Sequence, residues 1–218
     1  TLFLARDRLG QKPLFYAEAD GRIAFASGPQ ALVTLPWISD EVDLTSVHDY
    51  LVYQYVPEPR SIYQRIKKLP PHSYALWNGG EMEVHGYWSP LIGEESPANS
   101  YTETAAHLRE SLKEAVSRRM VADVPVGMFL SGGMDSSLIC ALAQQCSDKP
   151  VHTFSIGFPE QKYDERHYAE KVAEKLGTEH HFMEVDPSDF DHLEKIVRRF
   201  EEPFADASML PTALLSSF

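Results

Sequence analysis

The sequence has few cysteines, no long apolar run and a shortage of basic residues. Cys140 and Cys146 are its only cysteines, and six positions apart on one expected helix they point to different faces, which predicts two free thiols. No apolar run approaches the roughly 18 to 20 residues of a membrane span. The charged residues Arg6, Asp7 and Arg8 near the start are unlike a signal peptide. These absences favour a cytoplasmic protein outside the membrane.

The charge balance is acidic, with 20 Lys and Arg against 32 Asp and Glu and a net charge of −12. Such a chain repels phosphate backbones, which argues against nucleic acid as a general partner. Hydrophobic residues make up 43% and charged residues 24%, so a packed core is expected. The 218 residues suffice for about one and a half domains of typical size. A strand is expected from Thr1 to Leu4, and an apolar helix without a cap is expected at Leu210–Leu215. We therefore expect the sequence to be an internal piece of a longer protein.

Short apolar strands and turn signals fill the first ninety residues. Asp20-Gly21 joins two of them into an expected hairpin, 14–17 with 22–26, and Asn78-Gly79-Gly80 joins another, 73–77 with 81–85. Asp43 is placed to cap a helix that the proline-rich segment 56–60 stops. The first part is therefore predicted to be strand-rich with one helix.

Pro, Gly, Glu, Ser and Asn dominate residues 89–100, which is typical of a linker. Beyond it, strands expected at 124–130, 151–158 and 181–185 alternate with helices near 108–120, 135–146 and 169–176. Further helices are expected at 190–200 and from 210. Strands that alternate with helices of this length predict a parallel sheet with crossover helices, and the whole chain an α/β fold.

The segment from Ser131 to Ser137, Ser-Gly-Gly-Met-Asp-Ser-Ser, follows an expected strand and opens a helix. Adjacent glycines let backbone N–H groups approach a ligand, and the helix start directs its unpaired N–H groups at the same point. This arrangement predicts an anion site, and phosphate is the favoured ligand. The alternative is a serine-capped glycine turn without a ligand.

Two features refine the predicted phosphate site. A Walker loop requires a lysine that this loop lacks, which argues against ordinary P-loop phosphotransfer. Asp135 would repel a phosphate unless a divalent cation lay between them, so Mg²⁺ is implied, with Asp135 as its ligand.

The loop, with the preceding Phe129-Leu130, resembles the pyrophosphate loop of the ATP pyrophosphatase fold and is most similar to that of glutamine-hydrolysing asparagine synthetases. Further stretches resemble the same family in the same order. They are Arg6–Tyr16, Tyr55–Pro59, Lys68–Pro71, Phe154–Phe158, Leu176–His181 and Glu202–Asp206.

The resemblance implies a glutamine amidotransferase and ligase that makes asparagine from aspartate. Residues 1–88 would be the strand-rich end of an N-terminal-nucleophile glutaminase domain, and 89–100 the linker. Residues 101–218 would be the start of a parallel-sheet, adenine nucleotide α hydrolase-like synthetase domain. ATP, Mg²⁺, glutamine and aspartate are the implied ligands, and a homodimer is allowed.

The resemblance also assigns roles to particular residues. The backbone of Leu130 and Ile156 would meet the adenine nucleotide, and Asp7 would bind the α-amino group of glutamine. Without the family, Asp7 could instead pair with Arg6 or Arg8. The pyrophosphate would be held by Ser131, Gly132, Gly133, Asp135 and Ser136.

The sequence departs from the family pattern in ways that leave alternatives open. No cysteine precedes Cys140 to serve as glutaminase nucleophile, so no catalytic residue is assigned and the chain alone is expected to be inactive. Later ATP and acyl-adenylate contacts of the family would lie beyond Phe218, and Asp206–Met209 lacks an arginine that some members use to hold aspartate. A related amide-forming or β-lactam-forming synthetase and a non-catalytic nucleotide-binding fragment are the alternatives.

Two weaker signals have simpler interpretations. His180 and His181 are expected to be packed or solvent-facing rather than metal ligands, because neighbours on a strand point to opposite faces. Ser131 lacks the first glycine of a G-x-S-x-G nucleophile motif, which argues against a serine hydrolase.

Overall fold

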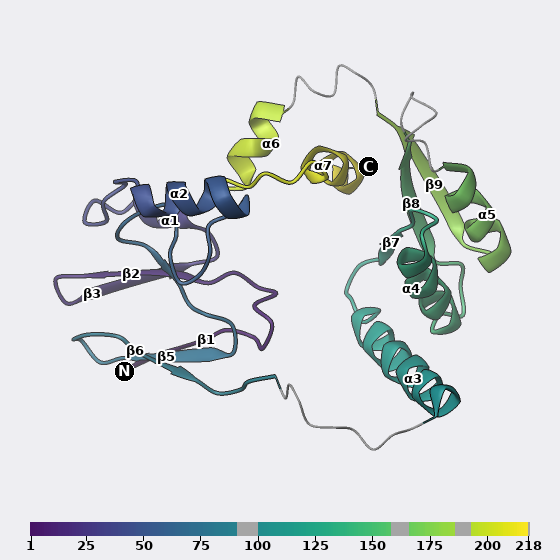
Figure 1. Cartoon of the computed structure of the whole chain (residues 1–218), viewed down its shortest axis with the longest axis horizontal. Coiled ribbons are helices and arrows are strands. Elements are labelled where there is room, and N and C mark those ends of the chain that lie inside the picture. Colours follow the sequence, from purple (N-terminus) through teal and green to yellow (C-terminus); the bar gives the residue numbers. More distant parts are fainter. Residues whose placement is uncertain (91–99, 158–165, 186–192, 218) are drawn as a thin grey trace. The chain divides into compact units, whose positions relative to one another are not determined.

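The computed structural model describes residues 1–90, 100–157, 166–185 and 193–217, and has a mixed α/β fold built from three small sheets (Figure 1). The chain divides into two compact units. Unit 1 contains Thr1–Glu94 together with Glu194–Ala207, and unit 2 contains Glu95–Leu193 together with Ser208–Phe218. No helix within the described ranges is long and apolar enough to cross a membrane.

Unit 1 contains two antiparallel three-stranded sheets. One has the order β1-β5-β6, and the other the order β3-β2-β4. Both predicted hairpins are confirmed, since β2 pairs with β3 and β5 with β6 in antiparallel register. Asp20 and Gly21 have φ of 51° and 67°, which a tight hairpin turn requires. The strands of the unit are β1 (Leu2–Ala5), β2 (Phe15–Ala19), β3 (Arg22–Ala26), β4 (Lys67–Lys68), β5 (Ser73–Trp77) and β6 (Glu83–Gly86).

Strand β2 is buried on both faces because its side chains alternate between two hydrophobic clusters. Phe15 and Ala17 pack with Leu32 of the short helix α1 (Pro29–Val33). Tyr16 points the other way and packs with Leu4 of β1 in the second cluster. The unit is thus layered, with β2 between a helix and the other sheet.

Helix α2 (Leu44–Tyr53) begins as the sequence predicts. Its N-cap Asp43 accepts a hydrogen bond from the Thr45 N–H at 3.0 Å. A part of unit 1 that the sequence did not indicate comes from far along the chain. Most of helix α6 (Leu193–Arg199) and the segment that follows it to Ala207 belong to this unit.

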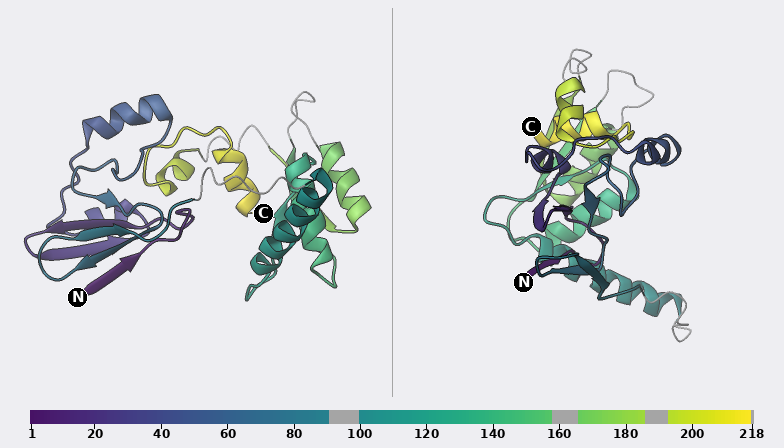
Figure 2. Two further views of the ribbon diagram at one scale, coloured as in Figure 1. Left: turned by 60° about the horizontal axis from the view of Figure 1, so that its bottom comes forward. Right: turned by 90° about the vertical axis from the view of Figure 1, so that its left-hand side faces the viewer.

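Unit 2 is built on a parallel sheet in the order β7-β8-β9, as the alternating pattern predicts (Figure 1). Helix α4 contacts both α3 and α5. Helices α5 and α7 both contact β8, from opposite sides of the sheet (Figures 1 and 2). The elements are α3 (Tyr101–Arg119), β7 (Gly127–Phe129), α4 (Met134–Gln145), β8 (His152–Gly157), α5 (Arg166–Leu176), β9 (Glu179–Glu184) and α7 (Met209–Ser217).

The core of unit 2 lies between the helices and one face of the sheet. Val116, Leu142 and Val151 form one cluster, and Leu130 with Cys140 and the alanines of α5 form the next. Because the apolar residues of α4 and α5 face this core, the strand ends at β7 and β8 are held in fixed positions.

Several predicted boundaries were wrong. The strand expected over 124–130 extends only over Gly127–Phe129, because Pro125 has no N–H to donate and Val124 is 71% exposed. Strand β9 begins two residues earlier than expected. Helix α3 begins at Tyr101, earlier than expected, on a capping box between Ser100 and Glu103. The expected linker lies mostly outside the described residues, as does the start of the helix expected at 190–200.

Candidate functional site

The loop between β7 and α4 lies at the carboxyl end of a parallel strand, where ligands of open α/β sheets bind. The Leu130 N–H donates to the Phe154 carbonyl at 2.8 Å, which extends the pairing of β7 with β8 to the start of the loop. Leu130 is buried, and half-buried Ile156 lies near the carboxyl end of β8. The structure therefore brings Leu130, Ile156 and the serine-glycine loop to one edge of the sheet.

The two glycines of the loop have different structural roles. Gly132 has φ of +80°, and a Cβ placed on it would lie 2.6 Å from Tyr168 Cβ and 2.7 Å from the Ala169 nitrogen at the start of α5. Gly133 is the N-cap of α4 and has φ of −68°. A Cβ placed on it would lie 3.3 Å from its nearest neighbour, Ser131 Oγ. Gly132 is thus required for packing, whereas Gly133 keeps the space in front of the helix open.

The serines of the loop hydrogen-bond with each other and with the loop backbone. Ser131 Oγ and Ser136 Oγ are hydrogen-bonded at 2.9 Å, and the Gly133 N–H donates to Ser131 Oγ at 3.3 Å. Ser136 Oγ also bonds the Gly133 carbonyl at 3.2 Å. The Ser137 hydroxyl is buried and has no hydrogen-bond partner among the described residues. A preformed loop of this kind offers N–H and hydroxyl donors to an anion at little ordering cost.

The Asp135 side chain fits the expected role of a magnesium ligand. It lies in the first turn of α4 and is exposed. Mg²⁺ bound with a nucleotide takes one or two carboxylates and fills its other positions with phosphate oxygens and water. A single accessible carboxylate next to the serine-glycine loop is compatible with that requirement.

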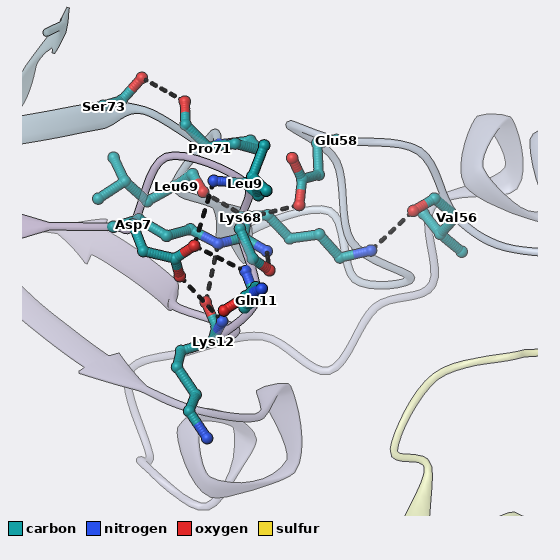
Figure 3. Close-up of polar contacts among 12 residues, drawn as sticks. Asp7, Leu9, Gln11, Lys12, Val56, Glu58, Lys68, Leu69, Pro71 and Ser73 are labelled. Atoms are coloured by element: carbon teal, nitrogen blue, oxygen red, sulfur yellow. Dashed lines mark hydrogen bonds and ion pairs between the residues drawn. The ribbon is translucent and has the colours of Figure 1, made fainter. Parts of the chain in front are cut away.

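The Asp7 carboxylate organises its own loop in unit 1 (Figure 3). Its Oδ1 accepts the N–H groups of Leu9 at 3.2 Å and Gln11 at 2.9 Å, and its Oδ2 accepts the Lys12 N–H at 3.0 Å. The Lys12 and Gln11 hydrogen bonds, above all, lower the pKa of Asp7 below its ordinary value of 3.8, so the group is ionised at neutral pH. Of roughly four lone-pair positions on a carboxylate, about one stays open for an external donor.

The alternative ion pairs for Asp7 do not form, because its two arginine neighbours have other partners. Arg6 is buried, pairs with Glu58 at 2.5 Å and donates to the Leu69 carbonyl at 2.6 Å. The Arg8 guanidinium stacks over the Trp88 ring at 5.8 Å.

A pocket of about 500 Å³ lies beside this loop, and sequence reasoning missed it. Lys68 and Glu202 form an ion pair of 2.7 Å in its wall, with side chains only 12% and 14% exposed. Glu202 also accepts the Ile62 N–H at 2.8 Å, and Lys68 donates to the Val56 carbonyl at 2.7 Å (Figure 3). Both residues lie in stretches that carry the family resemblance, but nothing local indicates that they meet across 134 positions. The lining is Arg6, Pro13, Leu14, Phe15, Tyr55, Val56, Pro57, Glu58, Lys68 and Glu202.

The predictions for the cysteines and for His180 are confirmed. Both thiols are free, and burial raises the pKa of Cys140, which keeps that thiol protonated. His180 is packed on one face of the sheet, where its ring nitrogens bond Thr153 and Ser155 at 3.0 Å each. The neighbouring His181 points to the other face, as expected for a strand.

Two family models match different parts of the chain. The family model of a glutamine amidotransferase domain matches residues 1–88, and that of asparagine synthase matches 107–217. The glutamine-hydrolysing asparagine synthetase 1 of Bacillus subtilis is 33% identical over 97% of this chain and 33% of its own length. The glutamine-hydrolysing asparagine synthetase 2 of Arabidopsis thaliana is 31% identical over 92% of this chain and 31% of its own length.

A solved structure of glutamine-dependent NAD⁺ synthetase from Acinetobacter baumannii, in complex with ADP, has a TM-score of 0.40 at 22% identity. The likeness covers 58% of this chain and 25% of that one. The chain spans about a third of the length of the two synthetases. Because the synthase model covers half of the residues and the amidotransferase model most of the others, the chain belongs to the asparagine synthase family.

Proposed function

We propose that the chain supplies two parts of a glutamine-dependent asparagine synthetase. Residues 1–88 form the end of an N-terminal-nucleophile glutaminase domain, 89–100 the linker, and 101–218 the start of an ATP pyrophosphatase-like synthetase domain. The observation that carries the proposal is the preformed Ser131–Ser136 loop between a parallel strand and a helix. The family membership of both halves supports it.

The reaction proposed for the complete enzyme has two steps. The aspartate side-chain carboxylate attacks the α-phosphorus of ATP, and the bond to the bridging oxygen of the β-phosphate breaks to release pyrophosphate. Ammonia from glutamine then attacks the activated carbonyl carbon, AMP leaves with the bonding electron pair, and a proton is lost from nitrogen. Water releases the ammonia from glutamine and leaves glutamate, so the products are asparagine, glutamate, AMP and pyrophosphate.

In this mechanism the described loop binds the part of ATP that leaves. The N–H groups at the start of α4 and the hydroxyls of Ser131 and Ser136 donate to the pyrophosphate oxygens. Their fixed geometry stabilises the negative charge that develops on the leaving group. The backbone at Leu130 and Ile156 meets the adenine nucleotide. Mg²⁺, held with Asp135, would neutralise phosphate charge.

The role proposed for Asp7 is to bind the α-ammonium group of glutamine. The carboxylate is ionised and has about one lone-pair position free. Its three N–H bonds fix its direction, so that a charge-assisted hydrogen bond to an ammonium group would form without reordering of the side chain.

Nucleotide binding by the 218-residue chain tests the proposal. Titration with the α,β-methylene analogue of ATP and Mg²⁺ should show one site, and Gly133→Val should weaken binding more than about tenfold by filling the space before the helix. Gly80→Val is the matched control, because that glycine is also free of close neighbours but lies in the hairpin of unit 1. Equal affinity in the Gly133 and Gly80 variants would contradict the assignment of the loop.

The activity itself is tested by the products. In a protein that carries this chain at the length of its relatives, pyrophosphate and AMP should appear from ATP only when aspartate is present. Release of ADP and phosphate instead would rule out cleavage between the α and β phosphates.

A further inference from the structure

Three side chains that commonly ligate metals meet at the amino ends of β8 and β9. His152 is the first residue of β8, and Glu179 and His181 are the first and third residues of β9. The parallel register pairs His152 with Glu179 and Phe154 with His181. Because side chains alternate along a strand, residues 152, 154, 179 and 181 share one face of the sheet, opposite His180.

The distances within this cluster match those of a tetrahedral metal centre. His152 Nδ1 lies 3.1 Å from His181 Nε2 and 3.7 Å from one carboxylate oxygen of Glu179. The other carboxylate oxygen of Glu179 lies 3.6 Å from His181 Nε2. Two ligand atoms each about 2.0–2.1 Å from a tetrahedral ion lie about 3.3–3.4 Å apart. With one oxygen of Glu179 taken as its ligand atom, the three ligand atoms all lie within 4.8 Å of one another, so small side-chain rotations would bring them to coordination distance.

The surroundings hold the two imidazoles in place and leave them accessible. The His181 ring stacks on the Phe154 ring at 4.9 Å and on the His152 ring at 5.4 Å. The side chains of His152, Glu179 and His181 are 39%, 57% and 33% exposed, so an ion can reach them from solvent. Sequence spacing did not indicate these neighbours of His181, because the strand register brings His152 next to residues 27 and 29 positions away.

We propose that His152, Glu179 and His181 bind one divalent transition-metal ion, with Zn²⁺ as the preferred occupant and water in the fourth position. Two imidazole nitrogens and one carboxylate oxygen form a donor set that suits Zn²⁺ better than Mg²⁺ or Ca²⁺.

The site is separate from the nucleotide loop. His152 pairs with Gly127, four residues and about 13 Å of strand before Ser131. His181 is level with Phe129 but lies on β9, two strands and about 10 Å across the sheet from β7. The ion joins β8 to β9 and reinforces the sheet that positions the loop. Its expected effect is on the stability of unit 2.

Cobalt and zinc titrations of the 218-residue chain test the proposal. Co²⁺ should bind with a stoichiometry of one and give the intense visible absorption of a four-coordinate site, and Zn²⁺ should displace it. His152→Gln and Glu179→Gln should each weaken Co²⁺ binding by more than about tenfold. Zn²⁺ should raise the unfolding midpoint of unit 2 in the unaltered chain.

Two control variants separate this site from other binding. His85→Gln removes an exposed histidine that also lies near a glutamate, Glu83 at 3.5 Å. It belongs to no group of three metal-ligating side chains in the described parts of the chain, so affinity should stay unchanged. Cys146→Ser removes the more accessible thiol and should also have no effect. Absence of Co²⁺ binding, a six-coordinate spectrum, or full binding by the doubly substituted His152→Gln/His181→Gln chain would overturn the proposal.

Discussion

Replacing Gly132 by alanine should destabilise unit 2, because this glycine packs against α5. The backbone at Gly132 has φ of +80°, and alanine in a left-handed conformation costs about 1–2 kcal/mol. The added methyl group would also lie 2.6 Å from Tyr168 Cβ and 2.7 Å from the Ala169 nitrogen. Overpacking of this kind costs about 1–3 kcal/mol. The expected loss in the free energy of unfolding is therefore about 2–5 kcal/mol.

The two units carry different spectroscopic probes, which allows the loss to be located. Trp37, Trp77 and Trp88 are the only tryptophans and all lie in unit 1. The three longest helices of the described chain, α3, α4 and α5, all lie in unit 2. Tryptophan fluorescence therefore follows the unfolding of unit 1, whereas far-ultraviolet circular dichroism is dominated by unit 2.

Urea denaturation with both probes measures the effect. With a slope of about 1.5 kcal/mol per molar urea, the dichroism midpoint of Gly132→Ala should fall by about 1–3 M while the fluorescence midpoint stays in place. Gly133→Ala is the control, because that glycine has φ of −68° and an N-cap glycine replaced by alanine costs about 1 kcal/mol or less. An unchanged dichroism midpoint in Gly132→Ala, or an equal fall in the control, would refute the reasoning.

Four further predictions concern the charged groups and thiols. Asp7→Asn should reduce the loss of unit 1 stability at acid pH. A carboxylate whose folded pKa is lowered contributes free energy of unfolding above pH 3.8, and that contribution is lost as the pH falls through the folded pKa. Urea titrations followed by tryptophan fluorescence at pH 7 and pH 3 check this. Glu202→Gln should cost unit 1 about 3 kcal/mol by leaving the Lys68 ammonium unpaired, and a double-mutant cycle with Lys68→Met should show that the two losses are not additive. Iodoacetamide should label Cys146 in the native chain and Cys140 only in urea, as mass spectrometry of peptides would show, because burial raises the Cys140 pKa. The chain should release no ammonia from glutamine, since unit 1 contains no cysteine to act as a nucleophile; release that disappears on substitution of Cys140 or Cys146 would contradict the assignment of the two halves.

Local signals in the sequence were enough to predict the hairpins, the Asp43-capped helix and the strand–loop–helix at Ser131. Each depends on residues within about ten positions of one another, whose turn geometry, capping and apolar period are set by neighbouring side chains. The roles expected for Leu130 and Ile156 came from the family resemblance, and the parallel sheet places both residues near the carboxyl ends of their strands.

Only the tertiary structure decided which distant residues meet. Glu202 reaches Lys68 because the segment after α6 packs in unit 1, and no periodic pattern records that contact. His152 joins Glu179 and His181 through the register of β8 with β9, in which a shift of one residue would turn the histidine to the other face. The different roles of Gly132 and Gly133, identical in sequence terms, come from the position of α5, which lies against Gly132 alone. Such contacts depend on how elements pack, and packing is a property of the folded chain rather than of any short stretch of it.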